Sequence, residues 1–265
     1  MNELVDTEPI NNKLNYFSMI KYKIQFFKIC LSVVIVLCTA SSCSKEEPPV
    51  EEEQLPWTII NFNPDVNYGS MTDQDGNTYR TVVIGNQEWM AENLRTTTFN
   101  DGTPIPKITF NWARASNGDL RTDSAYCVYN FSANQDTIAV YGLLYNWYAV
   151  NTGKLAPHGW HVPSYDEWKT LIDYLGGYST AAPKLQESGK SHWLDTRNNA
   201  SNETGFTALP CGMVRDRFEQ IGECAYWWSS TELTNADNAA WYFNLYGQLM
   251  YIHKELGFSV RCIKD

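Results

Sequence analysis

Hydrophobic and polar residues alternate in short runs over most of the chain after residue 56. Such runs, rich in aromatic and β-branched residues and separated by Gly, Asn and Asp, predict strands joined by tight turns. The predicted strands are residues 79–84, 226–230, 239–246, 249–253 and 258–263. We therefore expect many short strands.

One segment, residues 165–175, has helical periodicity instead. Its apolar residues recur at i, i+3, i+4 and i+7, which places them on one helix face: Trp168, Leu171, Ile172 and Leu175. Ser164 and Glu167 have the spacing of a capping box, and two glycines after residue 175 supply a stop. A second helix is predicted over residues 143–150, although its Tyr and Trp residues are also common in strands.

Few helices among many short strands predict an α+β fold. No Pro-rich or charge-rich linker interrupts residues 68–265, so residues 57–265 are predicted to form a single domain.

The first 56 residues have a different pattern. Residues 1–18 carry three acidic residues and one lysine, a poor start for a secretory signal, and are predicted to be a start-site extension. Residues 19–42 have three lysines followed by an apolar run, which predicts a signal peptide. The run is shorter than the roughly 20 apolar residues that cross a membrane, so a transmembrane helix is the less favoured interpretation.

Cys43 follows the small residues Ala40, Ser41 and Ser42, which resemble a bacterial lipobox, although Ala40 stands where leucine is usual. The resemblance implies that Cys43 is lipidated and holds the protein on the membrane; two or more acyl chains anchor stably. The alternative is an ordinary secretory cleavage site.

Residues 43–56 are rich in acidic residues and proline and are predicted to be an extended tether. Ser44 followed by acidic residues resembles the surface-export signal of Bacteroidota lipoproteins. We therefore expect a lipid-anchored protein on the outer surface of the outer membrane, although a plain spacer would have the same composition.

The charge of the chain excludes one class of partner. The 265 residues include 20 basic and 30 acidic ones, and the formal net charge is −10. Without residues 1–56, 15 basic and 22 acidic residues remain, a net charge of −7. Nucleic-acid binders need a cationic surface, so nucleic acid is not an expected partner.

A series of motifs after residue 68 occurs in an order that resembles one family. They are Asp75-Gly76-Asn77, the segment 84–94, Tyr141-Gly142, Gly159-Trp160-His161-Val162-Pro163, the segment 204–210, Trp228-Ser229-Ser230 and Ser259-Val260-Arg261-Cys262. Together they resemble the Fibrobacter succinogenes major paralogous domain, found in lipoproteins of Bacteroidota and Fibrobacterota. The resemblance implies a fold similar to the C-type-lectin-like and formylglycine-generating-enzyme-like folds, with two helices and twisted antiparallel sheets. The function of this family is largely unassigned.

Four cysteines remain beyond the signal peptide and Cys43, and they allow three pairings. Relatives have cysteine at the positions of Cys127, Ala156 and Cys262 and glycine at that of Cys211, so this chain departs from them at Ala156 and Cys211. On this resemblance we expect a local bridge, Cys211–Cys224, and a long-range bridge, Cys127–Cys262. Free buried thiols are the alternative.

A metal site would need more ligands than the obvious cluster supplies. His158 and His161 lie near Asp166 and Glu167, but Glu167 is used in the cap and zinc sites usually need three or four ligands. The segment beginning at Asp73 lacks the glycine and glutamate of a calcium loop and predicts a β-turn.

The chain has no P-loop and no nucleophile elbow. It also lacks the calcium-binding triplets of C-type lectins and the cysteine pair of formylglycine-generating enzymes. We therefore expect no catalytic residue, no metal and no cofactor.

The aromatic residues near the C-terminus are candidates for a ligand platform that stacks on sugar rings: Trp227, Trp228, Trp241, Tyr242 and Tyr246. The alternative is a structural role, because large aromatic residues dominate cores. Neighbours in a strand face opposite sides, so at least one of Trp227 and Trp228 is expected in the core.

We expect a non-catalytic binding or adhesion domain that contacts the membrane through its lipid and binds a glycan or another surface protein. A glycan-binding module is the first alternative, and a metal-dependent enzyme is the least favoured.

Overall fold

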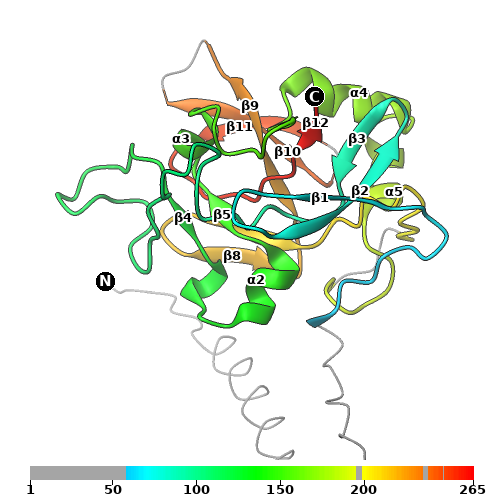
Figure 1. Ribbon diagram of the computed structural model, residues 1–265, viewed down its shortest axis with the longest axis horizontal. Helices are drawn as coiled ribbons and strands as arrows, with labels where there is room; N and C mark the ends of the chain where they lie inside the picture. Colours follow the sequence, from blue (N-terminus) through cyan, green and yellow to red (C-terminus); the bar gives the residue numbers. More distant parts are fainter. Residues whose placement is uncertain (1–57, 195–198, 235–237, 247) are drawn as a thin grey trace, which may run out of the picture. The chain divides into compact units, whose positions relative to one another are not determined.

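Short antiparallel strands make up most of the regular structure in the computed structural model, which describes residues 58–194, 199–234, 238–246 and 248–265 (Figure 1). The predicted start-site extension, signal peptide, lipidated Cys43 and tether lie outside the described residues. No helix in the described ranges is long and apolar enough to span a bilayer.

The largest sheet joins the two ends of the described chain. Its strand order is β1 (Gly69–Thr72), β2 (Thr78–Ile84), β3 (Gln87–Met90), β12 (Ile263–Lys264) and β6 (Trp160–His161). Every neighbouring pair in this sheet is antiparallel.

A second sheet has three antiparallel strands. Its order is β11 (Gln248–His253), β10 (Ala239–Asn244) and β9 (Tyr226–Glu232). Two smaller ribbons pair β4 (Tyr126–Cys127) with β5 (Leu144–Tyr145), and β7 (Cys211–Val214) with β8 (Phe218–Ile221). The described residues thus form one mixed α+β domain with antiparallel sheets, as predicted.

The helices are short. They are η2 (Tyr129–Phe131), α2 (Gln135–Tyr141), α3 (Trp147–Val150), α4 (Tyr165–Tyr174) and α5 (Tyr178–Leu185). The prediction of α4 is confirmed to within one residue at its end, and both halves of the Ser164–Glu167 capping box are formed.

Two predicted elements are correct over only part of their length. The helix expected over residues 143–150 is a strand at Leu144–Tyr145, and only one turn, α3, follows. Tyr145 pairs with Tyr126, so pairing with β4 overrides the helical pattern. The strand expected over residues 258–263 is regular only at its end, because residues 258 and 259 bridge two different partners, Tyr145 and Trp227.

The core lies on both faces of β9. Trp227 belongs to one hydrophobic cluster, with Trp168 and Phe243, while Trp228 belongs to another, with Phe258 and Val260. Strand β9 therefore has no solvent-facing side over its first residues, and it divides the interior into two packed halves.

Candidate functional site

The aromatic platform predicted from the sequence is not formed. Trp227 and Trp228 are 0% exposed, and Tyr242 is also buried. Their polar atoms are used inside the protein: Trp227 Nε1 donates to Asn93 Oδ1 at 2.9 Å, and Trp228 Nε1 donates to the Tyr145 carbonyl at 2.7 Å. The prediction failed because both faces of β9 are covered.

Trp241, another residue of the predicted platform, is partly buried. It packs against two tyrosine rings that the sequence analysis did not connect with it. Its ring centroid lies 4.7 Å from that of Tyr165 and 5.7 Å from that of Tyr251, at interplanar angles of 64° and 79°. The rings meet edge to face, so they present no continuous flat surface on which a sugar could stack. Tyr246 is exposed on a neighbouring turn and donates to the Glu223 carbonyl.

The histidine cluster that was considered as a metal site contains ion pairs between His161 and two carboxylates. His161 contacts Glu167 and Asp265, each at 2.7 Å. His158 is exposed and makes no described contact with this group. Across the described ranges, no three His, Cys, Asp or Glu residues are placed to hold one metal ion.

The Asp73 segment is a turn, as predicted. The Gly76 amide donates to the Asp73 carbonyl at 3.0 Å, and Asp73 Oδ1 accepts from the amides of Asp75 and Asn77. Its carboxylate is therefore occupied by its own loop.

The four described cysteines are free buried thiols, so the two predicted bridges are absent. Cys127 and Cys262 belong to different hydrophobic clusters, which explains why they do not pair. Cys211 and Cys224 are neighbours through the backbone, where the Gly212 amide donates to the Cys224 carbonyl, but they also remain unbonded. Burial raises the pKa of the Cys262 thiol.

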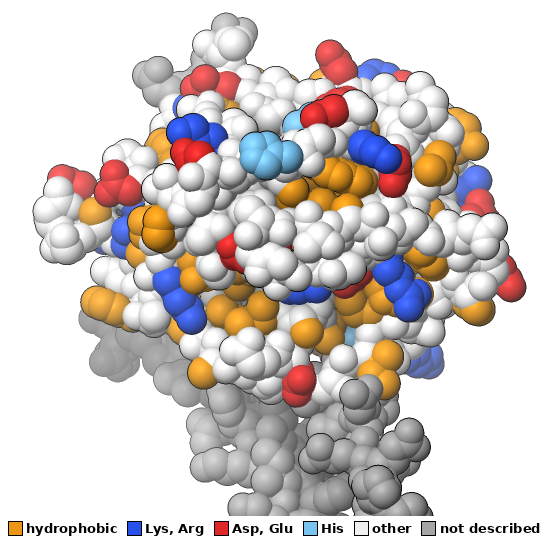
Figure 2. All heavy atoms as spheres, in the orientation of Figure 1, with side chains coloured by type: hydrophobic (Ala, Val, Ile, Leu, Met, Phe, Trp, Pro, Cys, Tyr) orange, Lys and Arg blue, Asp and Glu red, His pale blue; other side chains and the backbone are white. Residues whose placement is uncertain are grey.

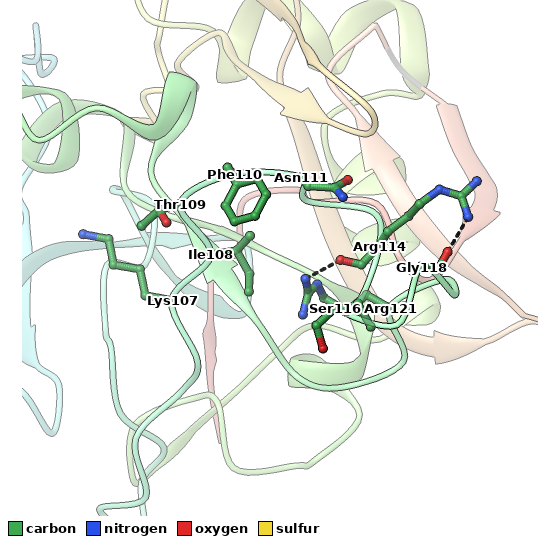
Figure 3. A pocket seen from close by; sticks show the side chains of 10 residues that line it. Lys107, Ile108, Thr109, Phe110, Asn111, Arg114, Ser116, Gly118 and Arg121 are labelled. Carbon is green, nitrogen blue, oxygen red and sulfur yellow. Dashed lines mark hydrogen bonds between the residues drawn. The ribbon is translucent and has the colours of Figure 1, made fainter.

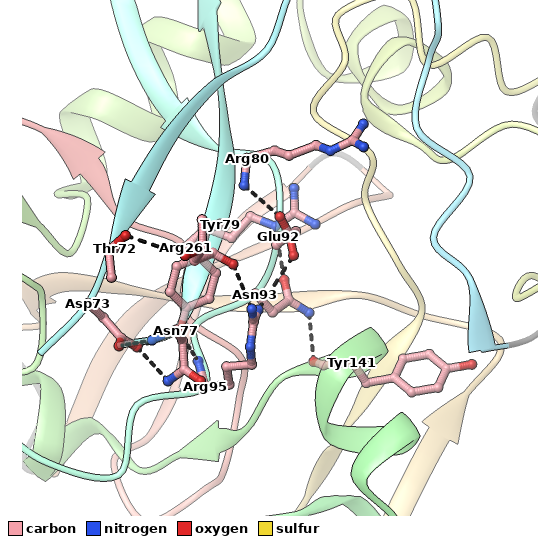
Figure 4. A network of polar contacts seen from close by, with 11 residues as sticks. Thr72, Asp73, Asn77, Tyr79, Arg80, Glu92, Asn93, Arg95, Tyr141 and Arg261 are labelled. Atoms are coloured by element: carbon pink, nitrogen blue, oxygen red, sulfur yellow. Dashed lines mark hydrogen bonds and ion pairs between the residues drawn. The ribbon is translucent and has the colours of Figure 1, made fainter. Parts of the chain in front are cut away.

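A network of polar side chains is buried where β2, β3 and the C-terminal segment meet (Figure 4). Arg261 is fully buried and donates to Asn93 Oδ1 at 2.9 Å, to the Thr207 carbonyl at 2.8 Å and to the Phe206 carbonyl. Burial lowers the pKa of Arg261 to about 9. Each of its three side-chain nitrogens donates to a protein acceptor, so the network is structural.

Tyr79 belongs to the same network. Its hydroxyl donates to Asp73 Oδ2 at 2.6 Å and accepts from the Arg95 amide at 2.9 Å. Burial and the Asp73 carboxylate raise the pKa of Tyr79, so the hydroxyl stays protonated.

Two open hollows on the surface share one residue, Lys107. The first, which we name the Gln135 hollow, has a volume of about 500 Å³. Its lining comes from separate segments: Asp75, Asn77, Arg95, Thr97, Lys107, Tyr126, Val128, Gln135, Ile138 and Leu143. The second, the Phe110 hollow, has a volume of about 440 Å³ and is lined by residues between Lys107 and Arg121 (Figure 3). Neither hollow was predicted.

The order and spacing of the motifs along this fold point to a known family. A model of the Fibrobacter succinogenes major domain matches residues 82–264. The chain belongs to this family. No curated protein and no solved structure is similar enough to match.

The match to the Fibrobacter succinogenes major domain begins within β2, so the preceding segment lies outside it. That segment is nevertheless built into the domain: the Asn61 amide donates to Glu187 Oε1 at 2.8 Å. Glu187 in turn contacts His192 Nδ1 at 2.7 Å, and both side chains are fully buried. Asp75 and Asn77 of the Gln135 hollow also precede the matched residues.

Proposed function

We propose that the protein is a surface-exposed outer-membrane lipoprotein whose α+β domain binds an extracellular ligand without catalysis. The signal peptide, Cys43 and the acidic tether predicted from residues 19–56 support the location. The observation that carries the binding role is the Gln135 hollow, an open surface hollow lined by hydrogen-bonding groups.

Part of this hollow is rigid before any ligand arrives. The Asp75 carboxylate accepts from the amide and hydroxyl of Thr97, at 2.5 and 2.8 Å. Arg95 donates to the Thr78 carbonyl at 2.6 Å, and its guanidinium lies 4.2 Å from the centre of the Tyr79 ring. Groups fixed in this way lose little freedom on binding, which favours affinity.

Other groups of the hollow are free to meet a ligand. The side chains of Lys107 and Gln135 are exposed and have no partner within the described part of the chain. Three apolar residues, Val128, Ile138 and Leu143, also line the hollow, and the other seven lining residues carry polar groups. A lining of this kind favours a polar ligand that forms several hydrogen bonds.

A glycan is the second candidate ligand, because sugars also combine hydroxyl groups with apolar C–H faces. The finer fold assignment proposed for this domain, a C-type-lectin-like fold, is compatible with that ligand. The chain lacks the calcium-binding triplets of C-type lectins, so any glycan binding here would be independent of calcium.

The proposal that the domain does not catalyse a reaction is supported by its titratable side chains, several of which have structural roles. Glu167 caps α4, Asp73 closes its own turn, and Glu187 and His192 pair in the interior. A metal-dependent enzyme, the least favoured alternative, would require stoichiometric copper, iron or zinc in the purified protein.

A glycan and metabolite binding screen with the purified full chain tests the binding role. We expect a reproducible ligand whose binding is weakened by Gln135→Ala. The matched control is Lys190→Ala, an exposed side chain outside both hollows. Equal binding by Gln135→Ala and the parent protein for every ligand found would contradict the Gln135 hollow as the site.

Cell fractionation tests the location separately. Cys43→Ala is expected to release the protein from the membrane fraction, and protease added to intact cells is expected to digest the parent protein. Membrane retention of Cys43→Ala would contradict lipidation at this residue.

A further inference from the structure

The loop that forms the Phe110 hollow has a charge opposite to that of the domain. Residues 107–121 contain Lys107, Arg114 and Arg121 but a single acidic residue, Asp119. The loop therefore carries a net charge of +2 in a domain whose net charge is −7. Figure 2 shows that charges of both signs are interspersed on the visible face, so the basic excess of this loop is a local feature.

None of the three cations is neutralised by a carboxylate within the described ranges. Arg121 Nε donates to the Trp112 carbonyl at 2.9 Å, and Arg121 Nη2 donates to the Arg114 carbonyl at 2.6 Å. Arg114 Nη1 donates to the Gly118 carbonyl at 2.8 Å. These backbone contacts orient the guanidinium groups without cancelling their charge, and Lys107 has no described partner at all.

The cations are distributed along the hollow rather than gathered at a point. In Figure 3, Lys107 extends at one end, the Arg114 guanidinium lies at the other, and Arg121 lies between them. A single small anion could not contact all three groups. The arrangement fits a ligand with several anionic groups spaced along its length.

An exposed apolar surface lies between the charges. Phe110 is 75% exposed, the most exposed of the large hydrophobic side chains in the described residues. It lies beside Ile108 in the hollow. An aromatic face next to cations suits a ligand that combines charge with an apolar face.

We propose that the Phe110 hollow binds an acidic polysaccharide, a chain of sugar rings bearing carboxylate or sulfate groups. The anionic groups pair with Lys107, Arg114 and Arg121, and the C–H face of a sugar ring stacks on Phe110. Nucleic acid fits less well, because its phosphates are more closely spaced than the acidic groups of such a polysaccharide and a domain of net charge −7 repels them more strongly. The inference adds a second binding site to the one proposed above, because it uses a different hollow.

Affinity measurements with defined polymers test it. The purified full chain is titrated with polygalacturonate, chondroitin sulfate and neutral dextran at 50 and 300 mM NaCl. We expect binding to one or both acidic polymers, none to dextran, and weaker binding at the higher salt concentration, because salt screens exposed charges. Polygalacturonate and chondroitin sulfate distinguish carboxylate from sulfate recognition.

Three variants locate the site. Phe110→Ala and the double variant Lys107→Glu/Arg114→Glu are each expected to raise the Kd for the acidic polymer about fivefold, which corresponds to about 1 kcal/mol, the upper end of the range for one exposed contact. The control Lys190→Glu makes a charge reversal outside the hollow and is expected to leave Kd unchanged. A thermal melt identical to that of the parent protein confirms that each variant is folded.

Several outcomes would overturn the proposal. The first is that the protein binds dextran as tightly as the acidic polymers. The second is that Lys190→Glu weakens binding as much as the variants in the hollow do. The third is that poly-glutamate binds as tightly as the acidic polysaccharides and depends on Phe110 to the same extent. A neutral ligand that binds through Gln135 while acidic polymers do not bind would leave the proposed function intact and refute this inference alone.

Discussion

His161 lies between two carboxylates, with Nε2 2.7 Å from Glu167 Oε1 and Nδ1 2.7 Å from Asp265 Oδ1. A neutral imidazole carries one N–H, so both contacts can be hydrogen bonds only when the ring is protonated. The second oxygen of Glu167 accepts from the amide and hydroxyl of Ser164, at 2.7 and 2.8 Å. The start of α4 is therefore linked to the charge of His161.

This arrangement predicts a pH dependence. Partial burial alone would lower the pKa of His161, but the hydrogen bonds and charges of Asp265 and Glu167 outweigh it and raise the pKa above its ordinary 6.5. The stabilisation is therefore complete below about pH 6.5 and is lost as pH rises through the folded-state pKa. Urea unfolding should show His161→Gln less stable than the parent protein at pH 5.5, by less than about 1 kcal/mol for so exposed a pair, and nearly equal at pH 9.

The control for this prediction is His158→Gln, because His158 is exposed and outside the cluster. It should leave stability unchanged at both pH values. A difference between His161→Gln and the parent protein that is the same at pH 5.5 and pH 9 would contradict the assignment of a charged His161.

Arg261 is predicted to be the most sensitive charged residue in the domain. Arg261→Leu would leave the carbonyls of Phe206 and Thr207 without their donor, while Asn93 Oδ1 would still accept from the Trp227 indole. Each unsatisfied buried group costs about 1–3 kcal/mol, so a total loss of at least about 2 kcal/mol is expected in urea unfolding. Arg261→Lys should also destabilise, because an ammonium group cannot reproduce the planar fork.

Arg217→Ala is the comparison for Arg261, since its side chain is 75% exposed. It should change stability by less than about 0.5 kcal/mol. If Arg261→Leu were equally mild, the buried network would not be important for stability.

Ser164→Ala removes the N-cap of α4. The Ser164 hydroxyl accepts from the Glu167 amide, and loss of such a cap costs about 1 kcal/mol. Ser164→Thr retains the hydroxyl and should recover most of the loss. Thermal unfolding measures both, and equal melting temperatures for the two variants would show that the cap contributes nothing.

A comparison of Gly212 with Gly102 separates two reasons why a position requires glycine, a left-handed backbone conformation and a lack of space for a Cβ atom. Both have positive φ angles, 63° and 82°. A Cβ at Gly212 would overlap the Glu219 carbonyl and lie 2.7 Å from the Ile221 amide nitrogen, whereas a Cβ at Gly102 would meet nothing within 4 Å. Gly102→Ala should cost about 1 kcal/mol, the penalty of the left-handed conformation, and Gly212→Ala clearly more. Equal losses in denaturant unfolding would contradict the clash.

The four free thiols are predicted to react at different rates. Cys224 is 9% exposed, while Cys127, Cys211 and Cys262 are at most 1% exposed. Burial raises the pKa of all four thiols, which slows alkylation. Iodoacetamide without reductant should label Cys224 first and the others only on unfolding, as read by peptide mass spectrometry. A recovered Cys127–Cys262 or Cys211–Cys224 disulfide peptide would refute the free state.

The sequence predicted elements whose signals are local. The α4 helix was found because its cap, apolar face and glycine stop lie within about one dozen residues. The α5 helix was missed because it contains Pro183, which normally ends a helix. Strand β12 was placed too early because residues 258 and 259 form long-range bridges that no local pattern specifies.

The distinction between local signals and long-range contacts also applies to the two hollows. The Gln135 hollow combines residues from Asp75 to Leu143, and nothing in the sequence brings these segments together. The Phe110 hollow lies within 15 consecutive residues, and its excess of basic residues was visible in the sequence but was hidden by the acidic average of the domain. The prediction of an aromatic platform was wrong because the sequence shows where tryptophans occur but does not show that both sides of β9 are covered.

Strand β9 places Trp227 on one face and Trp228 on the other, with both indoles buried. A slip of the strand by one residue would move one tryptophan into the other's position, but it would bring Tyr226 or Ser229 into the position that was left, so side-chain size opposes it. The two indole N–H groups oppose it as well, because each has its own acceptor, Asn93 Oδ1 for Trp227 and the Tyr145 carbonyl for Trp228. The alignment of β9 is thus encoded twice, by the sizes of its buried side chains and by two hydrogen bonds, and a misaligned strand would lose both.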